Sequence, residues 1–215
     1  MVEEWSLQKV LADLPPLTSN SEPAKIVYFL HLLERLKTTP REGWRRHGIK
    51  APESISDHMY RMSLISLLVS PSTVDASKCM KLALVHDMAE LIVGDITPLD
   101  GVAKSEKNRR EQETMVYLAS LLPKAAGEML VELWQEYEDG ETKEAAFVKD
   151  VDKFELLLQM VEYERVHPEK NLEEFWHVAK GIKGEGMVPF VDELAKERAV
   201  LKEGKEAKQV KECTE

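Results

Sequence analysis

One histidine and three carboxylates stand close together inside one of the most apolar stretches of the chain. His86 and Asp87 directly follow a Leu-Ala-Leu-Val run. Glu90 comes about one helical turn later, and Asp95 follows the next glycine. Burying charge among apolar side chains is costly unless the charge is paired or binds a metal ion. A helix end with a solvated polar tip would explain Asp95 but not the embedded His-Asp pair, so the pattern favours the metal centre of a hydrolase.

The segment that carries these residues is predicted to be one buried helix from about residue 74 to residue 93. The segment is apolar almost all round, and it stops at Gly94, the residue type that most often follows a helix end. On an uninterrupted helix Glu90 lies at i+4 from His86 and at i+3 from Asp87. Glu90 is therefore expected to share a helix face with both residues.

Two further polar residues lie on apolar helix faces elsewhere in the chain. His58 falls in the first turn of a helix expected at 54–70, and Asp152 lies beside the apolar stripe of a helix expected at 142–167. Asp150 is a competing carboxylate on the second helix, but it points further round. A lone histidine at such a position is usually a core residue with a partner. A ligand role for His58 is favoured because the His-Asp pair needs further ligands, and two imidazoles with two carboxylates suit a divalent ion such as Mn, Co, Fe, Zn or Mg.

A loop with concentrated positive charge precedes the helix of His58. Residues 38–52 contain two prolines and two glycines, as is typical of loops. Around Trp44 this loop carries four basic residues, Arg41, Arg45, Arg46 and Lys50. In an acidic protein such a loop is a candidate contact for phosphate and base. The alternative is a solvated loop whose tryptophan fills the edge of the core, and the loop taken alone favours neither interpretation.

Hydrophobic periodicity predicts an all-α protein with a single domain. Helices are expected at about 22–37, 54–70, 74–93, 106–122, 123–137, 142–167, 172–181 and 188–201. A capping-box pattern at Ser54–Asp57 opens the second of them. The charged face of the helix at 106–122 is expected to be solvated or to face another subunit. We expect an N-terminal arm at 1–21, the helical domain at 22–203, and a disordered Lys/Glu-rich tail at 204–215.

Composition limits the classes of partner. The chain has 215 residues, a formal net charge of −10 and 43% hydrophobic residues. An acidic chain is not built to coat nucleic acid, although a local basic pocket or a metal can still bind a small phosphorylated ligand. Cys79 and Cys213 lack the spacing of a disulfide framework or a zinc cluster. Without an apolar run of about 18 residues or a signal-peptide pattern, we expect no membrane partner and a cytoplasmic, or also nuclear, location.

Three blocks of this sequence resemble the HD-domain 5′-deoxynucleotidases, within the HD-domain phosphohydrolase superfamily. The blocks are residues 53–62, 82–98 and 147–152, and the resemblance spans about residues 24 to 200. The resemblance implies a single HD-domain helical bundle with a buried metal site, and it also implies a homodimer. The metal ligands that it implies are His58, His86, Asp87 and Asp152.

The resemblance further implies hydrolysis of 2′-deoxynucleoside 5′-monophosphates to deoxynucleoside and phosphate. Glu90 and Asp95 match the two catalytic carboxylates of the family. A bound divalent ion lowers the pKa of its water towards about 7 and offsets phosphate charge. Either carboxylate can then serve as the acid for the leaving 5′-oxygen. The alternative is a second ion held by Glu90, Asp95 and the Ile96 carbonyl, which would make both carboxylates ligands.

The family places an arginine and a tryptophan before the first histidine to hold phosphate and sugar. Trp44 matches that tryptophan, but bacterial members have arginine directly before it and this chain has Gly43. Arg41 or Arg45 is therefore expected to bind the phosphate. Thr97, which follows Asp95 by two residues in the block 82–98, is the last expected substrate contact.

Two other functions remain as alternatives. A phosphodiesterase or a nucleoside-triphosphate hydrolase could use the same metal scaffold, although a short chain without extra domains favours a small monoester. A non-catalytic helical interaction protein with a vestigial site is the second alternative. Intact ligands together with Glu90 and Asp95 argue against it, because a non-enzyme has no reason to bury them.

Overall fold

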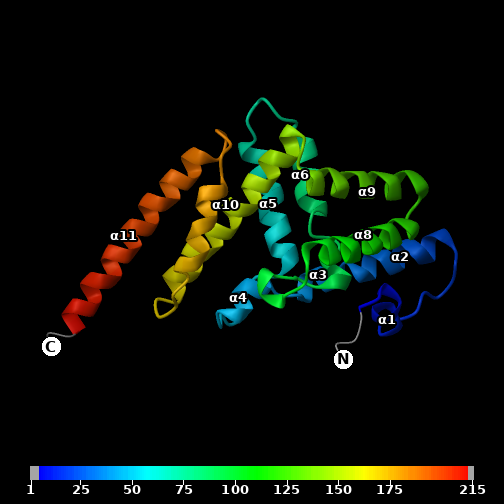
Figure 1. Ribbon diagram of the computed structural model, residues 1–215, viewed down its shortest axis with the longest axis horizontal. Helices are drawn as coiled ribbons and strands as arrows, with labels where there is room; N and C mark the ends of the chain where they lie inside the picture. The colour runs from blue at the N-terminus through cyan, green and yellow to red at the C-terminus, as the bar shows by residue number, and fades with distance from the viewer. Residues whose placement is uncertain (1–4, 213–215) are drawn as a thin grey trace.

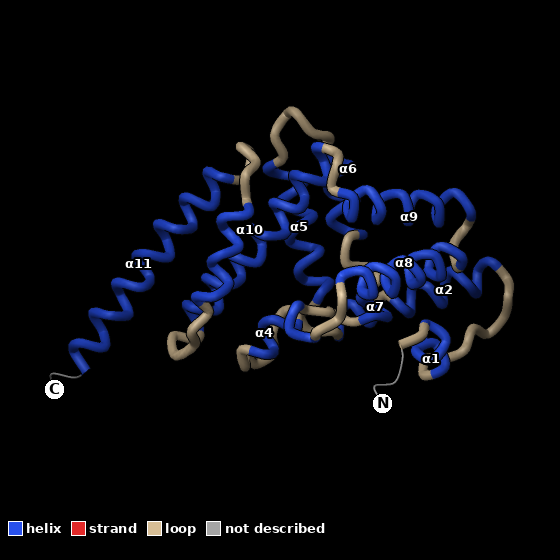
Figure 2. The backbone as a smooth tube through the Cα atoms, viewed as in Figure 1, coloured by secondary structure: helices blue, strands red, loops and turns tan. Residues whose placement is uncertain are grey.

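The computed structural model describes residues 5–212, with side chains up to residue 204. Helices joined by loops form this part of the chain, as Figure 2 shows. Its single β contact is an isolated bridge between Pro40 and Ser54. The predicted all-α class is confirmed.

The elements follow one another along the chain in Figure 1. Their bounds are α1 Leu7–Ala12, α2 Glu22–Leu32, α3 Glu34–Thr38, α4 Glu42–Arg46, α5 Ile55–Val69, α6 Ala76–Val85, α7 Glu90–Val93, the 3₁₀ turn η1 Pro98–Asp100, α8 Lys104–Ser120, α9 Lys124–Asp139, α10 Lys143–Val166, the 3₁₀ helix η2 Glu173–Gly181 and α11 Val188–Glu212.

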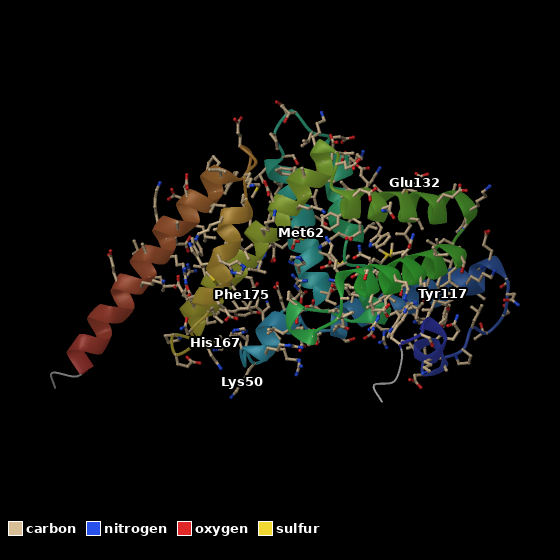
Figure 3. All side chains as sticks on the ribbon, viewed as in Figure 1. Lys50, Met62, Tyr117, Glu132, His167 and Phe175 are labelled. Carbon is tan, nitrogen blue, oxygen red and sulfur yellow. The ribbon has the colours of Figure 1, made fainter. Side chains whose placement is uncertain are left out.

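The largest core forms where α5, α6 and α10 meet in the middle of the bundle (Figure 1). Met62 of α5, which Figure 3 labels at this position, and Leu82 of α6 are fully buried against it. From α10 come the apolar stripe residues, among them Val148, Val151 and Leu157. Burying one such side chain contributes about 1.5–3 kcal/mol, so these three helices form a rigid frame.

A second core joins α2, α8 and α9 with the N-terminal segment. It contains Phe29 of α2, Met115 of α8 and Trp134 of α9, and Leu7 of α1 packs onto it. Trp5 lies under the guanidinium groups of Arg109 and Arg110 at about 5.5 Å. The segment before α2 therefore packs against the domain through apolar and cation–π contacts.

The helix predicted at 74–93 is interrupted, and that prediction is wrong in this respect. Helix α6 ends at Val85, and Glu90 begins the short α7. Between them the chain tightens, because the Met88 N–H bonds the Val85 carbonyl and the Glu90 N–H bonds the Asp87 carbonyl, each at 3.0 Å. These are i→i+3 bonds, so Glu90 does not reach the site through the predicted i+4 register.

The end of this segment agrees with the sequence. Gly94 follows α7 with φ of +80°, a conformation that residues with a Cβ adopt at a cost, and its N–H bonds the Glu90 carbonyl at 2.8 Å. The turn allows the chain to reverse towards Asp95.

Smaller differences occur at other boundaries. The helix expected at 22–37 is divided into α2 and α3, and the loop expected at 38–52 contains α4. Helix α11 runs through Glu212, into the segment from residue 204 for which disorder was expected. Residues 213–215 of that tail, with Cys213, and residues 1–4 of the expected arm lie outside the described residues. Within the described part, Cys79 is a buried free thiol, and no helix is long and apolar enough to cross a membrane.

Candidate metal centre

The first histidine of the site is fixed by the start of α5. Ser54 and Asp57 form the predicted capping box, since the Ser54 hydroxyl accepts from the Asp57 N–H at 3.1 Å and the Asp57 carboxylate accepts from the Ser54 N–H at 2.9 Å. His58 follows directly and is fully buried. The cap therefore sets where on α5 the imidazole leaves the backbone.

The second histidine is fixed by the end of α6. His86 Nδ1 lies 3.0 Å from the Ala83 carbonyl, which can only accept, so Nδ1 carries the proton. Its Nε2 is then a lone pair, and it is buried with no hydrogen-bond partner among the described residues. A lone pair held in this way is what a metal ligand requires.

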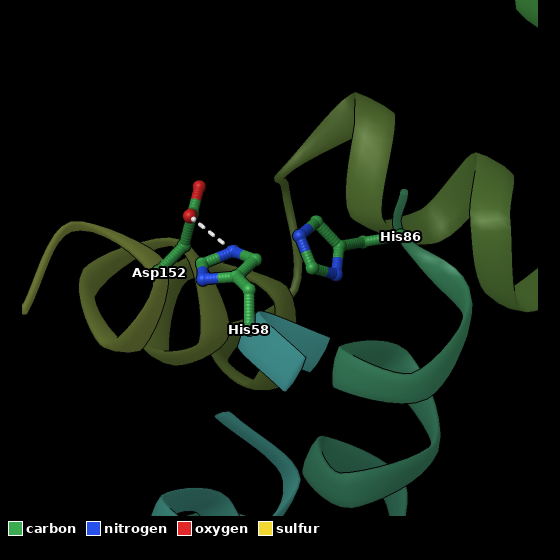
Figure 4. Close-up of side chains that lie close together, drawn as sticks. All are labelled: His58, His86 and Asp152. Carbon is green, nitrogen blue, oxygen red and sulfur yellow. Dashed lines mark ion pairs between the residues drawn. The ribbon is translucent and has the colours of Figure 1, made fainter. Parts of the chain in front are cut away.

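Three of the predicted ligands converge on one point, as Figure 4 shows. The ligand atoms of His58, His86 and Asp152 all lie within 4.8 Å of one another. His58 Nε2 is 3.2 Å from Asp152 Oδ1 but makes no hydrogen bond within the described structure. Two buried imidazole nitrogens without hydrogen-bond partners, beside a carboxylate, fit a divalent metal ion. Without an ion, burying these nitrogens unpaired would cost folding free energy.

The fourth predicted ligand lies at the edge of this group. Asp87 Oδ2 is 3.1 Å from His86 Nε2 and 3.9 Å from His58 Nε2. The same oxygen accepts a hydrogen bond from Arg41 Nη1 at 3.1 Å. Asp152 is held in a similar manner by the Tyr137 hydroxyl, which donates to its Oδ2 at 3.0 Å. Both carboxylates are thus oriented by neighbours, as coordinating carboxylates usually are.

The charges around the site keep both aspartates ionised. Burial alone would raise the pKa of Asp152, but His58 in its doubly protonated form lowers it to about 2, and a metal on Nε2 would take the place of that positive charge. Burial opposes ionisation of Asp87 as well, and His86 and Arg41 nevertheless hold the pKa of its carboxyl well below the usual range. Carboxylates must be deprotonated to bind a metal, so these environments prepare Asp87 and Asp152 for that role.

A cavity of about 570 Å³ opens onto these residues. One group of its lining side chains is charged: Arg41, Asp87, Glu90, Asp95, Lys107 and Asp152. Arg46 and Glu174 are charged as well, and the remaining lining side chains include Trp44, His47, Leu156, Phe175 and His177. Figure 3 labels Phe175 on the η2 side of the molecule. The cavity therefore combines a charged floor with an aromatic wall, which is the composition of a small-molecule site.

Glu90 and Asp95 both line the cavity but differ in their partners. Glu90 is buried, its Oε2 has no hydrogen-bond partner among the described residues, and its Oε1 lies 3.9 Å from Lys107 Nζ. Burial and then the charges of Asp87 and Asp95 raise the pKa of Glu90 well above its usual range. Asp95 accepts a hydrogen bond from the Glu42 N–H at 2.7 Å, which ties it to the start of α4.

The carbonyl of Ile96 also lies at this end of the cavity. It accepts a hydrogen bond from Lys107 Nζ at 3.3 Å. The three residues expected for a second ion all line this cavity, and the Lys107 ammonium lies near two of them, Glu90 and Ile96. Thr97 lines the cavity next to them, and its hydroxyl donates to Asp100 Oδ2 at 2.8 Å.

Of the two arginines expected to bind phosphate, the structure brings only Arg41 to the cavity. The Arg45 side chain is 61% exposed, pairs with Glu42 at 2.6 Å, and is not among the described residues that line the cavity. The positions therefore favour Arg41 over Arg45, because α4 turns the Arg45 side chain to the solvent. Arg46 does line the cavity, bound to Glu42 and Asp100.

Trp44 takes the core-edge position that one interpretation of the basic loop expects, and its contact with a substrate stays a prediction. Its side chain is 2% exposed, its indole N–H donates to Glu53 Oε1 at 2.9 Å, and its ring lies 4.5 Å from that of Phe175. It fills the edge of the core and also forms part of the cavity wall. Gly43 lies beside the same ring, and a Cβ there would be in ordinary contact with Phe175 at 3.4 Å.

Sequence reasoning missed several residues at the site. Lys107 was assigned to a solvated or subunit-facing helix surface, and nothing in its local pattern distinguishes it from its charged neighbours. Tyr137 had no signal either. Glu155 did have one, because a second carboxylate one turn after Asp152 on the same buried helix needs a partner.

The sequence model of the HD-domain family matches residues 33–189, which is most of the chain. The chain belongs to the HD-domain family. It is 48% identical over 178 residues to the 5′-deoxynucleotidase hdd1 of Schizosaccharomyces pombe, covering 80% of this chain and 90% of that protein. It is 43% identical to the human 5′-deoxynucleotidase HDDC2, with 81% and 86% covered. The PH0347 protein of Pyrococcus horikoshii OT3 has a similar structure, with a TM-score of 0.66, 30% identity, and 81% and 99% covered.

Proposed function

We propose that this HD-domain protein is a metal-dependent 5′-deoxynucleotidase that hydrolyses 2′-deoxynucleoside 5′-monophosphates to deoxynucleoside and phosphate. The observation that carries the proposal is the convergence of His58, His86 and Asp152 on one point beside the cavity. The names of the fungal and human relatives, which align over most of their lengths, support the same activity.

The metal would be held by His58, His86, Asp87 and Asp152, and this donor set is compatible with Mn, Co, Fe, Zn or Mg. Once bound, the ion supplies a water of lowered pKa and offsets the charge of the phosphate. Without such an ion the acidic floor of the cavity would repel the substrate.

Arg41 is the residue that we assign to the phosphate. Its guanidinium lines the cavity beside Asp87, and arginine suits the bidentate recognition of phosphate oxygens. Arg46 and Lys107 add positive charge to the same cavity. Trp44 and Phe175 offer apolar surface for the sugar and base, which carry no charge to be neutralised.

Glu90 and Asp95 are assigned to the transfer of the proton to the leaving 5′-oxygen. Burial and the charges of Asp87 and Asp95 raise the pKa of Glu90, which favours the protonated form that a general acid needs. The alternative is that both carboxylates bind a second ion together with the Ile96 carbonyl. The Lys107 ammonium lies where it can lessen the repulsion between the two carboxylates in either case.

We also propose that the active form is a homodimer. Four apolar side chains are exposed on α5: Tyr60, Leu64, Leu67 and Leu68. Their spacing of four, three and one residues places them on one helix face. An exposed apolar stripe of this kind is typical of an interaction surface, and it supports the dimer that the family resemblance implies.

The activity is tested with purified protein that has been stripped with a chelator and then supplied with single divalent metals, by measuring released phosphate, nitrophenol and the nucleoside or nucleotide products. The panel contains deoxynucleoside monophosphates, the matching ribonucleotides, deoxynucleoside triphosphates and bis(4-nitrophenyl) phosphate. We expect metal-dependent release that is fastest from the deoxynucleoside monophosphates. Faster cleavage of the diester or the triphosphates would favour the alternative hydrolases, and no release with any metal would favour a non-catalytic protein.

A further inference from the structure

The second ring nitrogen of His58 lies against a buried carboxylate that the proposed reaction does not use. Glu155 of α10 has no exposed surface, and its Oε2 is in close contact with His58 Nδ1. Glu155 is a different residue from the ligand Asp152, one helical turn away on the same helix. Such a carboxylate is expensive to bury, so its position requires an explanation.

Arg61 provides the counter-charge for Glu155. It lies one turn after His58 on α5, and its Nε donates to Glu155 Oε1 at 2.7 Å. Its other nitrogens donate to Gln159 at 2.6 Å and to Glu162 at 2.8 Å, both on α10. The guanidinium therefore clamps α5 to α10 and leaves one oxygen of Glu155 for His58.

A metal ion in this cluster is not needed to explain it. Glu53, His58 and Glu155 do lie close enough to hold one. However, Arg61 already supplies the positive charge at 2.6 Å from Glu155, and the Trp44 indole N–H donates to Glu53. A second cation would have to displace the guanidinium from its partners on α10.

We propose that Glu155, held in place by Arg61, is a positioning residue that fixes the ring of His58 with the proton on Nδ1 and the lone pair of Nε2 directed at the metal site. This inference rests on the proposed metal centre. A carboxylate only accepts hydrogen bonds when it is ionised, so it selects the tautomer with a protonated Nδ1. It also makes the imidazole a stronger donor to a metal than a backbone carbonyl does.

The two histidines of the centre are therefore held by different means. His86 Nδ1 bonds the neutral Ala83 carbonyl, while His58 Nδ1 faces a charged group that is itself anchored. Loss of an outer-shell partner of this type typically costs about 10–100-fold in metal affinity. The effect of removing Glu155 is expected at His58 alone.

Glu155→Gln tests the role with little change in shape. Glutamine has one accepting and one donating end, whereas Glu155 accepts on both oxygens. The variant must either give its amide N–H₂ to Arg61, which has no acceptor, or give it to His58 and force the proton onto Nε2. Arg61→Met removes the anchor and leaves Glu155 without its counter-charge, with His58 as its remaining partner. Glu162→Gln is the control, because Glu162 also binds Arg61 but is 42% exposed and does not contact His58.

The readouts are the affinity of the chelator-stripped protein for Co²⁺, measured by competition with a chromogenic chelator, and the histidine tautomers, measured by ¹⁵N NMR. We expect affinity to fall about 10–100-fold in Glu155→Gln and in Arg61→Met, with unchanged affinity in the control. In protein loaded with diamagnetic Zn²⁺, His58 is expected to show a single Nδ1–H form in the wild type and to lose it in Glu155→Gln. If this variant does not fold, Glu155→Asp is used, in which the shorter carboxylate is expected to weaken binding in the same direction.

Wild-type affinity and an unchanged His58 tautomer in the folded variants would overturn the inference while leaving the proposed function intact. A wild-type protein that binds no metal at all would instead overturn the proposed function. The two failures are therefore distinguished by the wild-type titration, before any variant is compared.

Discussion

At the scale of single residues, two aspartates on α10 have different partners and different roles. Asp150 accepts hydrogen bonds from the backbone N–H groups of Lys183 and Gly184, at 3.2 and 2.8 Å, and holds the loop before α11. Asp152 points to His58 and the Tyr137 hydroxyl instead. A rotation of two residues on a helix thus separates a loop anchor from a candidate metal ligand.

These two aspartates form a matched pair for testing the metal centre. We expect Asp152→Asn to lose most of the bound metal, because a neutral amide is a poor replacement for a carboxylate ligand. Asp150→Asn is expected to keep the metal and to lose about 1–3 kcal/mol of stability, since it weakens two buried backbone contacts. Elemental analysis and urea unfolding measure the two effects. Equal metal content in the two variants would contradict the assignment of Asp152.

The carboxylates at the cavity end make a second residue-scale prediction. Glu90→Gln and Asp95→Asn keep their shape but lose charge and proton-transfer capacity, so each is expected to retain the first metal and to lose most of kcat. Assays at increasing metal concentration separate the two assignments, because partial recovery indicates a second ion and no recovery indicates acid–base roles. Near-normal turnover in both variants without added metal would refute either role.

At the scale of elements, the orientation of α4 determines which arginine side chain reaches the cavity. Arg41 stands at its start and reaches Asp87, while Arg45 lies on the solvent side. We expect Arg41→Ala to raise KM for the nucleotide by about tenfold or more, as the loss of a charge-assisted contact would. Arg45→Ala serves as the control and should leave KM close to the wild-type value. A larger effect of Arg45→Ala in steady-state kinetics would return that residue to the site.

The break between α6 and α7 is the element that places Glu90 and Asp95 together. The short α7 that follows the break is capped by Gly94, whose φ is +80° and whose Cβ position has no neighbouring atom within 4 Å. Gly94→Ala is therefore expected to cost about 1–2 kcal/mol through backbone strain alone. Because Asp95 follows directly, kcat should fall as well. Gly204→Ala, in α11 and equally open, is the control, and urea unfolding with an activity assay compares them.

At the scale of the whole molecule, features that neighbouring residues encode could be predicted from the sequence, and features that depend on distant contacts could not. The capping box at Ser54 and the apolar stripe of α10 are encoded within a few residues, and the sequence located both. The position of α7 could not be predicted, because a distant residue contacts it: Arg35 of α3 donates to the Leu91 carbonyl. Lys107 is likewise brought to Ile96 only by the packing of α8.

The proposed homodimer supplies the last prediction. Leu68 is 75% exposed on the apolar face of α5 and is not part of the buried core, so Leu68→Glu should leave the monomer folded. A buried, unpaired carboxylate in a dimer interface would be costly, and the variant is therefore expected to sediment as a monomer when the wild type sediments as a dimer. Val200→Glu, at an exposed apolar position on α11, is the control and should leave the dimer intact. If Leu68→Glu remains dimeric while Val200→Glu does not, the interface lies on α11 and the α5 face serves another purpose.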